Sequence, residues 1–221
     1  MDSTEQMSLE GHRHGRVPRE IRKRQLLDVA DRIFGELGYQ GASIEAVAEA
    51  AGVTRPMVYN YFGSKKKLYL QCVQRARQQL EADMETAAAS AQDLRERMAR
   101  VADAYFQFVE KHAQAWDVLF DSDDGTAGPA AQEARDMRFG TVSRIAAMLR
   151  AETGPVLTDR DLEAFAHAMS GCGEQLAKWW RTQPDVSRAQ IVEYQVALCW
   201  DGFRHLRERT GPNPPARSGL A

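Results

Sequence analysis

The stretch from Ser43 to Lys65 constrains the fold more than any other part of the chain. Behind Ser43, a residue type that often caps helices, apolar residues recur at helical spacing. Gly52 then supplies a backbone that can turn left-handed, and Thr54 can cap a second helix. Pro56 falls in the first turn of that helix, where a missing N–H costs little. We therefore expect two short helices joined by a tight turn.

The second of these helices has an inner and an outer face. Val58 and Phe62 share the inner face, so Arg55, Tyr59 and Asn60 project outward. Side chains of these types contact phosphates and base edges in protein–DNA complexes. The pattern predicts a helix-turn-helix that enters the major groove of DNA. The alternative is a helix-turn-helix that binds protein, whose outer face would lack phosphate partners.

A third helix must cover the inner faces of this pair. Residues 19–37 carry apolar side chains at helical spacing, including Leu26, Ala30 and Phe34, and the three helices would form a head over residues 19–66. Residues 1–18 are expected to be a disordered basic arm. This arm is either a solubilising tail or a segment that reaches phosphates or the minor groove.

From residue 22 to residue 70 the chain closely resembles the DNA-binding domain of the TetR family of transcriptional regulators. The resemblance rests on many fixed spacings: the basic start, the apolar positions of the first helix, the helix end at Gly38, the AGVT turn, Tyr59, Phe62 and the Ser64–Lys65 pair. Three departures bear on the operator sequence: Pro56 and Tyr61 replace a frequent Gly and His, and Lys66 replaces an acidic residue.

Within this head we expect a division of labour on DNA. Arg55 and Asn60 would approach base edges, and Thr54, Tyr59 and Lys65 would hold phosphates. The full predicted DNA-binding set is Ser43, Thr54, Arg55, Pro56, Tyr59, Asn60, Tyr61 and Lys65. Neither repressor nor activator is favoured by the sequence.

The charge distribution indicates a local basic patch and not a protein that is basic throughout. The formal net charge is −2, yet residues 1–70 hold eleven Lys or Arg against nine Asp or Glu. From Gly52 to Lys67 there are four basic side chains and no acidic one. An electrostatic footprint for DNA is therefore expected beside the second helix.

Beyond the head the sequence predicts helices throughout. The pattern from Lys65 to about Ala89 has no Pro or Gly, so one helix should run from the head into a C-terminal domain at residues 67–209. Capping-box patterns at Thr158 and Ser187 mark two final helices, at about 159–181 and 188–208. Residues 210–221 are expected to be a disordered tail. The predicted fold is all-α, with about nine helices.

Catalytic and metal chemistry find little support. No nucleophile, P-loop or zinc motif is present, the five His are scattered, and the three Cys have no ligand spacing. The stretch Asp121–Pro129 does not fit a calcium loop in any register, and a solvated loop is expected. No segment reaches the length of a membrane span. We expect a cytoplasmic, soluble protein that is not an enzyme and holds no metal or cofactor.

The C-terminal domain is rich in aromatic residues, which could form a core or line a cavity. The resemblance implies a cavity, because TetR-like proteins bind a small effector in this domain and dimerise through their last two helices. The predicted pocket residues are Phe106, Trp116, Phe120, Phe139, Met169, Cys172 and Trp179. Because the last two helices are apolar on more than one face, we predict a homodimer through Phe165, Leu176, Leu198 and Phe203.

Segments such as QLLDVA, RPMVY, KLYL, VLFDSDD and FRHL are similar to regulators of fatty-acid synthesis genes that sense acyl-CoA. This resemblance implies an acyl-CoA or fatty acid as the effector of a palindromic operator complex. The alternative is a small aromatic compound, as in regulators of multidrug response.

Overall fold

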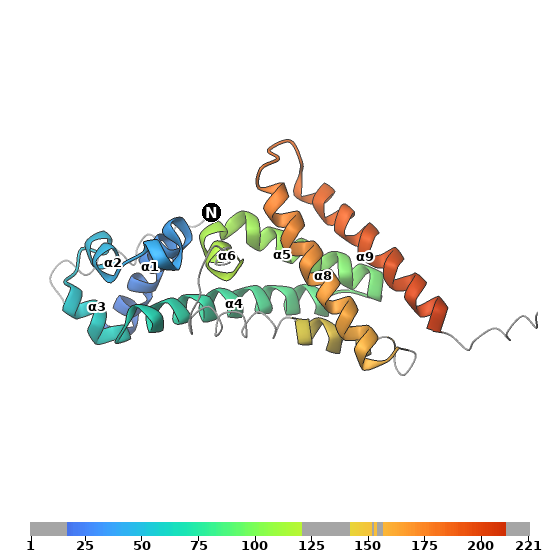
Figure 1. Ribbon diagram of the computed structural model, residues 1–221, viewed down its shortest axis with the longest axis horizontal. Helices are drawn as coiled ribbons and strands as arrows, with labels where there is room; N and C mark the ends of the chain where they lie inside the picture. The colour runs from blue at the N-terminus through green and yellow to red at the C-terminus, as the bar shows by residue number, and fades with distance from the viewer. Residues whose placement is uncertain (1–16, 121–141, 152, 154–156, 211–221) are drawn as a thin grey trace, which may run out of the picture.

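The computed structural model describes residues 17–120, 142–151, 153 and 157–210, and every regular element among them is a helix (Figure 1). Eight helices have both ends within these residues, and 142–151 form a further helical stretch. The predicted all-α fold is therefore confirmed. The expected loop 121–129 and most of the expected arm and tail lie outside the described residues. No described helix combines the length and apolar character that crossing a membrane requires.

Three helices form a head at one end of the molecule: α1 (Arg19–Gly41), α2 (Ile44–Ala50) and α3 (Arg55–Phe62) (Figure 1). Their inner faces are buried together with the start of the next helix. The apolar side chains at the centre of this head are Leu26, Ala30, Phe34, Ile44, Val47, Ala48, Val58, Phe62 and Leu68. Burial of these faces is what holds two such short helices in place.

Local signals set the ends of the head helices. The Ser43 hydroxyl accepts a hydrogen bond from the Ala46 N–H at 3.0 Å and caps α2. Gly38, Gly52 and Gly63 have φ of 64°, 63° and 77°, a region that favours glycine. The helical dihedrals of α1 break at Gly38, where the sequence predicts a helix end. These glycines therefore place the turns on either side of α2 and after α3.

α4 (Lys65–Ala89) is the long helix that the sequence predicts, and the Ser64 hydroxyl caps it by accepting from the Lys67 N–H at 3.1 Å. In Figure 1 it runs from the head along the lower side of the molecule to the C-terminal helices. Its buried side chains extend from Leu68 to Leu80. α4 thus belongs to the head and to the C-terminal part at once.

A second helix, α6 (Ala113–Phe120), also touches both the head and the C-terminal part. α5 (Leu94–Lys111) packs along α4, and α6 packs against α1 and α4 (Figure 1). α1 and α6 approach closely at Gly35, where an added Cβ would lie 2.9 Å from the Gln114 Cα and backbone oxygen. The sequence gives no sign of this contact, because nothing in the local pattern marks Gly35 as a packing site.

α8 (Asp159–Trp180) and α9 (Arg188–Thr210) form the far end of the molecule (Figure 1). Both predicted capping boxes are present: Thr158 and Asp161 exchange hydrogen bonds, as do Ser187 and Gln190. A second apolar core joins these helices to the start of α5 and to the 142–151 stretch. Its buried members are Leu94, Met98, Leu149, Leu157, Leu162, Met169, Cys199 and Phe203.

Candidate functional site

The exposed face of α3 carries the outward side chains that the sequence predicts. Val58 and Phe62 are buried, while Arg55, Tyr59 and Asn60 are exposed. Because these two groups lie on opposite faces of a short helix, the polar set is presented to solvent by a rigid support. Pro56 lies in the first turn and Thr54 precedes it, with no side-chain capping bond from Thr54 to the helix.

Four contacts fix basic and aromatic side chains around this face. Arg55 forms an ion pair with Glu45 of α2. The Arg19 guanidinium lies 5.0 Å from the ring centre of Tyr61, in cation–π geometry. Lys65 donates to the Gln40 backbone oxygen at 3.3 Å, and its ammonium lies over the ring of Tyr39. Lys65 therefore ties the start of α4 to the end of α1, with further donors left on the same ammonium.

Ion pairs connect α4 to α1 of the head. Arg75 of α4 pairs with Asp28 at 2.6 Å and with Asp31, both on α1. The Asp31 side chain is only 12% exposed, so its charge depends on this partner. Burial raises the pKa of Asp31, while the Arg75 guanidinium opposes that shift. Loss of Arg75 would leave a mostly buried carboxylate without its counter-charge.

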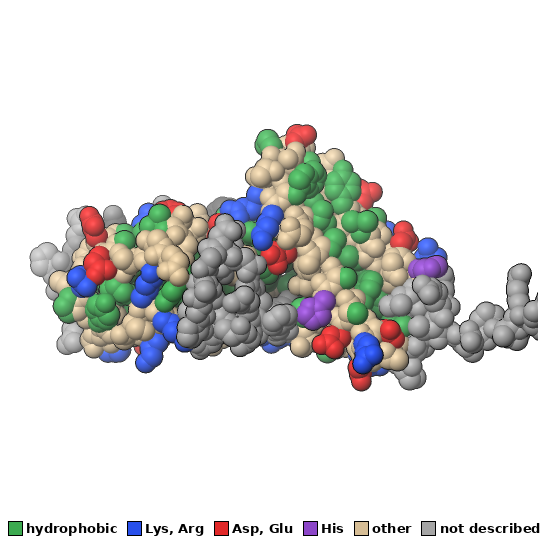
Figure 2. Space-filling view, in the orientation of Figure 1, with side chains coloured by type: hydrophobic (Ala, Val, Ile, Leu, Met, Phe, Trp, Pro, Cys, Tyr) green, Lys and Arg blue, Asp and Glu red, His purple; other side chains and the backbone are tan. Residues whose placement is uncertain are grey.

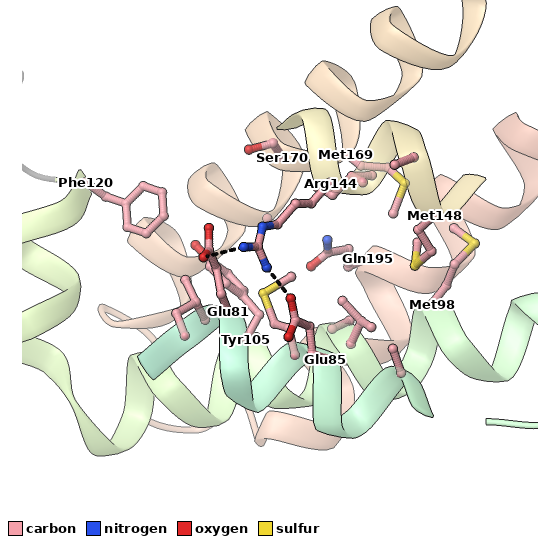
Figure 3. Close-up of a pocket in the computed structure, with 18 residues that line it drawn as sticks. Glu81, Glu85, Met98, Tyr105, Phe120, Arg144, Met148, Met169, Ser170 and Gln195 are labelled. Carbon is pink, nitrogen blue, oxygen red and sulfur yellow. Dashed lines mark hydrogen bonds and ion pairs between the residues drawn. The ribbon is translucent and has the colours of Figure 1, made fainter. Parts of the chain in front are cut away.

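The C-terminal part contains a partly open cavity of about 340 Å³. Its walls come from α4, α5, the end of α6, the 142–151 stretch, α8 and α9 (Figure 3). Most lining side chains are apolar, and several are methionines, which adapt to ligands of different shape. The volume falls in the range of small-molecule sites.

The structure brings two of the seven predicted pocket residues, Phe120 and Met169, into the wall of this cavity. Phe106 and Trp116 are buried in the core outside the lining, and Trp116 Nε1 donates to the Tyr105 hydroxyl at 3.0 Å. Phe139 lies outside the described residues.

Cys172 and Trp179 do not line the cavity either. Cys172 of α8 lies against Cys199 of α9 as a thiol, and burial raises the pKa of both. Trp179 is exposed on the surface of α8. Residue type alone does not show that Cys172 and Trp179 lie outside the cavity wall.

Polar groups of the cavity wall are missed by the sequence analysis. Arg144 extends from the 142–151 stretch to Glu81 and Glu85 of α4, with the Glu81 contact at 3.2 Å (Figure 3). Glu81 is mostly buried, whereas Arg144 is about half exposed. On α9, Gln195 is buried against the same cavity. The alternation of charged and apolar residues in α4 is typical of an ordinary amphipathic helix, so it gave no signal.

The outer surface of α8 and α9 carries exposed apolar side chains (Figure 2). Leu198 is 65% exposed, and Trp179 and Tyr194 are also exposed. By contrast, Phe203 is fully buried and packs on Phe165, with ring centres 5.0 Å apart. Leu176, also predicted at the interface, is partly buried against the main core.

The fold and the exposed face of α3 define a helix-turn-helix protein with a separate helical domain around a cavity. The family model for bacterial regulatory proteins of the tetR family matches residues 26–72, and a model for the tetracyclin repressor-like C-terminal domain matches residues 94–202. The chain belongs to the TetR family, and it is a TetR-type transcriptional regulator.

The chain is similar to two relatives in sequence, and it shares its fold with a further solved structure. The HTH-type transcriptional activator FasR of Mycolicibacterium smegmatis is 28% identical over 203 residues, which cover 89% of this chain and 90% of FasR. A TetR-like regulator from Rhodococcus sp. RHA1 superposes with a TM-score of 0.71 at 27% identity, over 86% of this chain and 99% of that one. The regulator FadR of Bacillus subtilis, solved with stearoyl-CoA, superposes with a TM-score of 0.69 at 17% identity, over 81% of this chain and 98% of FadR.

Proposed function

We propose that this chain is a homodimeric regulator that binds a palindromic operator and whose operator affinity is set by an apolar effector of the acyl-CoA or fatty-acid class. The observation that carries the proposal is the cavity itself: it is lined mainly by apolar side chains, and α4, which begins in the head, forms part of its wall. A ligand that fills this space contacts the helix that positions the DNA-binding face.

Three further observations favour an acyl ligand. Methionines such as Met84, Met98 and Met148 give the cavity a flexible apolar wall suited to a chain. Arg144 is half exposed at the wall, and its donors that Glu81 and Glu85 do not use can meet a carboxylate or a phosphate. In addition, FadR of Bacillus subtilis shares this fold and was solved with stearoyl-CoA.

Thermal unfolding with free fatty acids and acyl-CoAs of graded chain length tests the proposal, followed by operator titration with the strongest stabiliser. Operator fragments come from selection of genomic DNA on the purified protein, with random DNA as the control. We expect stabilisation by a subset of chain lengths and a change in operator affinity. Stabilisation by small aromatic compounds alone would favour the alternative effector class. If no apolar compound stabilises the protein, the effector proposal is wrong.

On DNA, Arg55→Ala is expected to relax preference at particular base pairs, at a cost of about 1–3 kcal/mol. Lys65, at the start of α4, is the basic residue predicted to hold a phosphate. Lys65→Ala should weaken binding to all DNA sequences similarly and reduce the salt dependence of binding by about one ion. Glu45→Gln, which removes the partner of Arg55, should tighten binding. Salt-dependent titration of operator and random DNA measures all three, and equal effects of Arg55→Ala on every sequence would contradict base readout.

For the dimer, we propose an interface through the exposed stripe of α8 and α9, centred on Leu198 and not on Phe203. Leu198→Glu places a charge at the centre of this interface and should give monomers at micromolar concentration. The reason is that two-fold symmetry buries the introduced carboxylates of both subunits in the same interface. Leu37→Glu, at a comparably exposed leucine of α1, should leave the assembly unchanged. Sedimentation analysis measures both, and a monomeric wild-type protein would rule out the dimer.

A further inference from the structure

One buried polar atom in the cavity wall has no hydrogen-bond partner among the described residues. The Gln195 side-chain oxygen is buried and accepts no hydrogen bond, although Gln195 as a whole is only 9% exposed. Buried amide groups are almost always paired in native proteins, because leaving one unpaired is costly. Figure 3 shows this amide among the side chains that line the cavity.

Glu81 and Glu85 pair with Arg144, and the Tyr105 hydroxyl accepts from Trp116. Ser170 also lines the cavity, but it is only partly buried. Among the described lining residues, Gln195 is the one with a buried side-chain oxygen that lacks a hydrogen-bond partner. An apolar chain alone would leave its oxygen unpaired.

Neighbouring residues hold the amide at the cavity. A Cβ added at Gly173 of α8 would lie 3.2 Å from Gln195 Nε2 and 3.6 Å from Tyr105 Cε1. The missing side chain at Gly173 thus makes room for the amide between α8 and the Tyr105 ring. Because Gly173, Tyr105 and Gln195 all line the cavity, the amide is fixed at its wall and not directed to solvent.

We propose that Gln195 recognises a hydroxyl group carried on the acyl chain of the effector, an inference that rests on the proposed function. A hydroxyl donates one hydrogen bond and accepts another, so it satisfies the oxygen and the NH₂ of the amide together, in either orientation of the amide. The thioester group itself and an unsubstituted hydrocarbon chain have no donor, so neither pairs with the oxygen. The effector class is therefore a hydroxylated acyl chain, as the free acid or as its thioester.

The test compares chain-matched ligands on wild-type protein and on Gln195→Leu. The probes are tetradecanoic acid and its β-hydroxy, mid-chain hydroxy and ω-hydroxy derivatives, each as the free acid and as the CoA thioester. Wild-type protein should bind one hydroxylated form about tenfold more tightly than the unsubstituted form. Gln195→Leu should lose this preference and bind the unsubstituted form at least as well as wild type. Free acids and thioesters together identify the source of the chain.

Controls distinguish a failure of the Gln195 inference from a failure of the proposed function. Gln78→Leu makes the same chemical change at an exposed site of α4 and should keep the hydroxyl preference. If Gln195→Leu does not fold, Gln195→Met provides an unbranched apolar replacement. A preference that is absent at every hydroxyl position, or that survives in Gln195→Leu, would overturn the inference, and a bound water would then satisfy the amide. In that case unsubstituted chains still bind and still alter operator affinity; if they do neither, the proposed function itself fails.

Discussion

Gly35→Val is expected to lower the free energy of unfolding by about 3 kcal/mol and to weaken operator binding. The added Cβ would lie 2.9 Å from the Gln114 Cα and backbone oxygen, a separation that real Cβ atoms do not tolerate. Since two of the three nearest atoms belong to the backbone of α6, no side-chain rotation relieves the contact. α6 must therefore move away from α1, and the head loses one of its two supports. Chemical denaturation and operator titration measure the two effects.

Matched variants locate the cause of that loss. Glu36→Val places the same side chain at the next, exposed position of α1 and should change stability by less than about 1 kcal/mol. Gln114→Ala shortens an exposed side chain but keeps the backbone atoms, so it should not rescue Gly35→Val. Full stability of Gly35→Val would show that α1 and α6 can separate without cost.

The head and the helix ends could be predicted because their signals are local. Ser43, Thr158 and Ser187 each act with neighbours three residues away, and Gly52 is required by a backbone angle. The long helix from Lys65 was also predictable, since a run without Pro or Gly needs no knowledge of the rest of the fold. Such features are set by short-range chemistry.

The cavity could not be predicted in the same way. Phe106 and Phe120 are both aromatic residues of the C-terminal part, yet Phe106 lies in the core and Phe120 in the cavity wall. What separates them is which helix faces which, and that is decided by contacts distant in sequence. Gln195 gave no periodic signal either, because a single amide on an apolar helix face is compatible with both a surface and a wall position.

Control of the head by the cavity is expected to depend on Arg75. In wild-type protein an effector should change operator affinity by about five- to hundredfold, which corresponds to a coupling free energy of about 1–3 kcal/mol. α4 carries both ends of this coupling: Glu81 and Glu85 at the cavity pair with Arg144, and Arg75 pairs with Asp28 and Asp31 of α1. A shift of α4 at the cavity therefore reaches α1 through Arg75.

Arg75→Met keeps the apolar stem of the side chain and removes its charge. Effector affinity without DNA should stay within about twofold, because Arg75 is absent from the cavity wall, whereas the coupling factor should fall towards one. Lys178→Met is the matched control, since Lys178 pairs at 2.9 Å with Glu174 of its own helix and neither residue lines the cavity. If Arg75→Met alone is unstable, combining it with Asp31→Asn removes the buried carboxylate charge that would otherwise lack a partner.

Paired titrations of effector with and without operator DNA measure the coupling in both directions, and linkage requires that the two factors agree. Full coupling in Arg75→Met would assign transmission to α6, whose contact with α1 at Gly35 is independent of Arg75. A ligand that stabilises wild-type protein without changing operator affinity would show that the cavity and the head are not coupled. Because α4 and α6 reach the head at different residues of α1, Arg75→Met and Gly35→Val together separate the two routes.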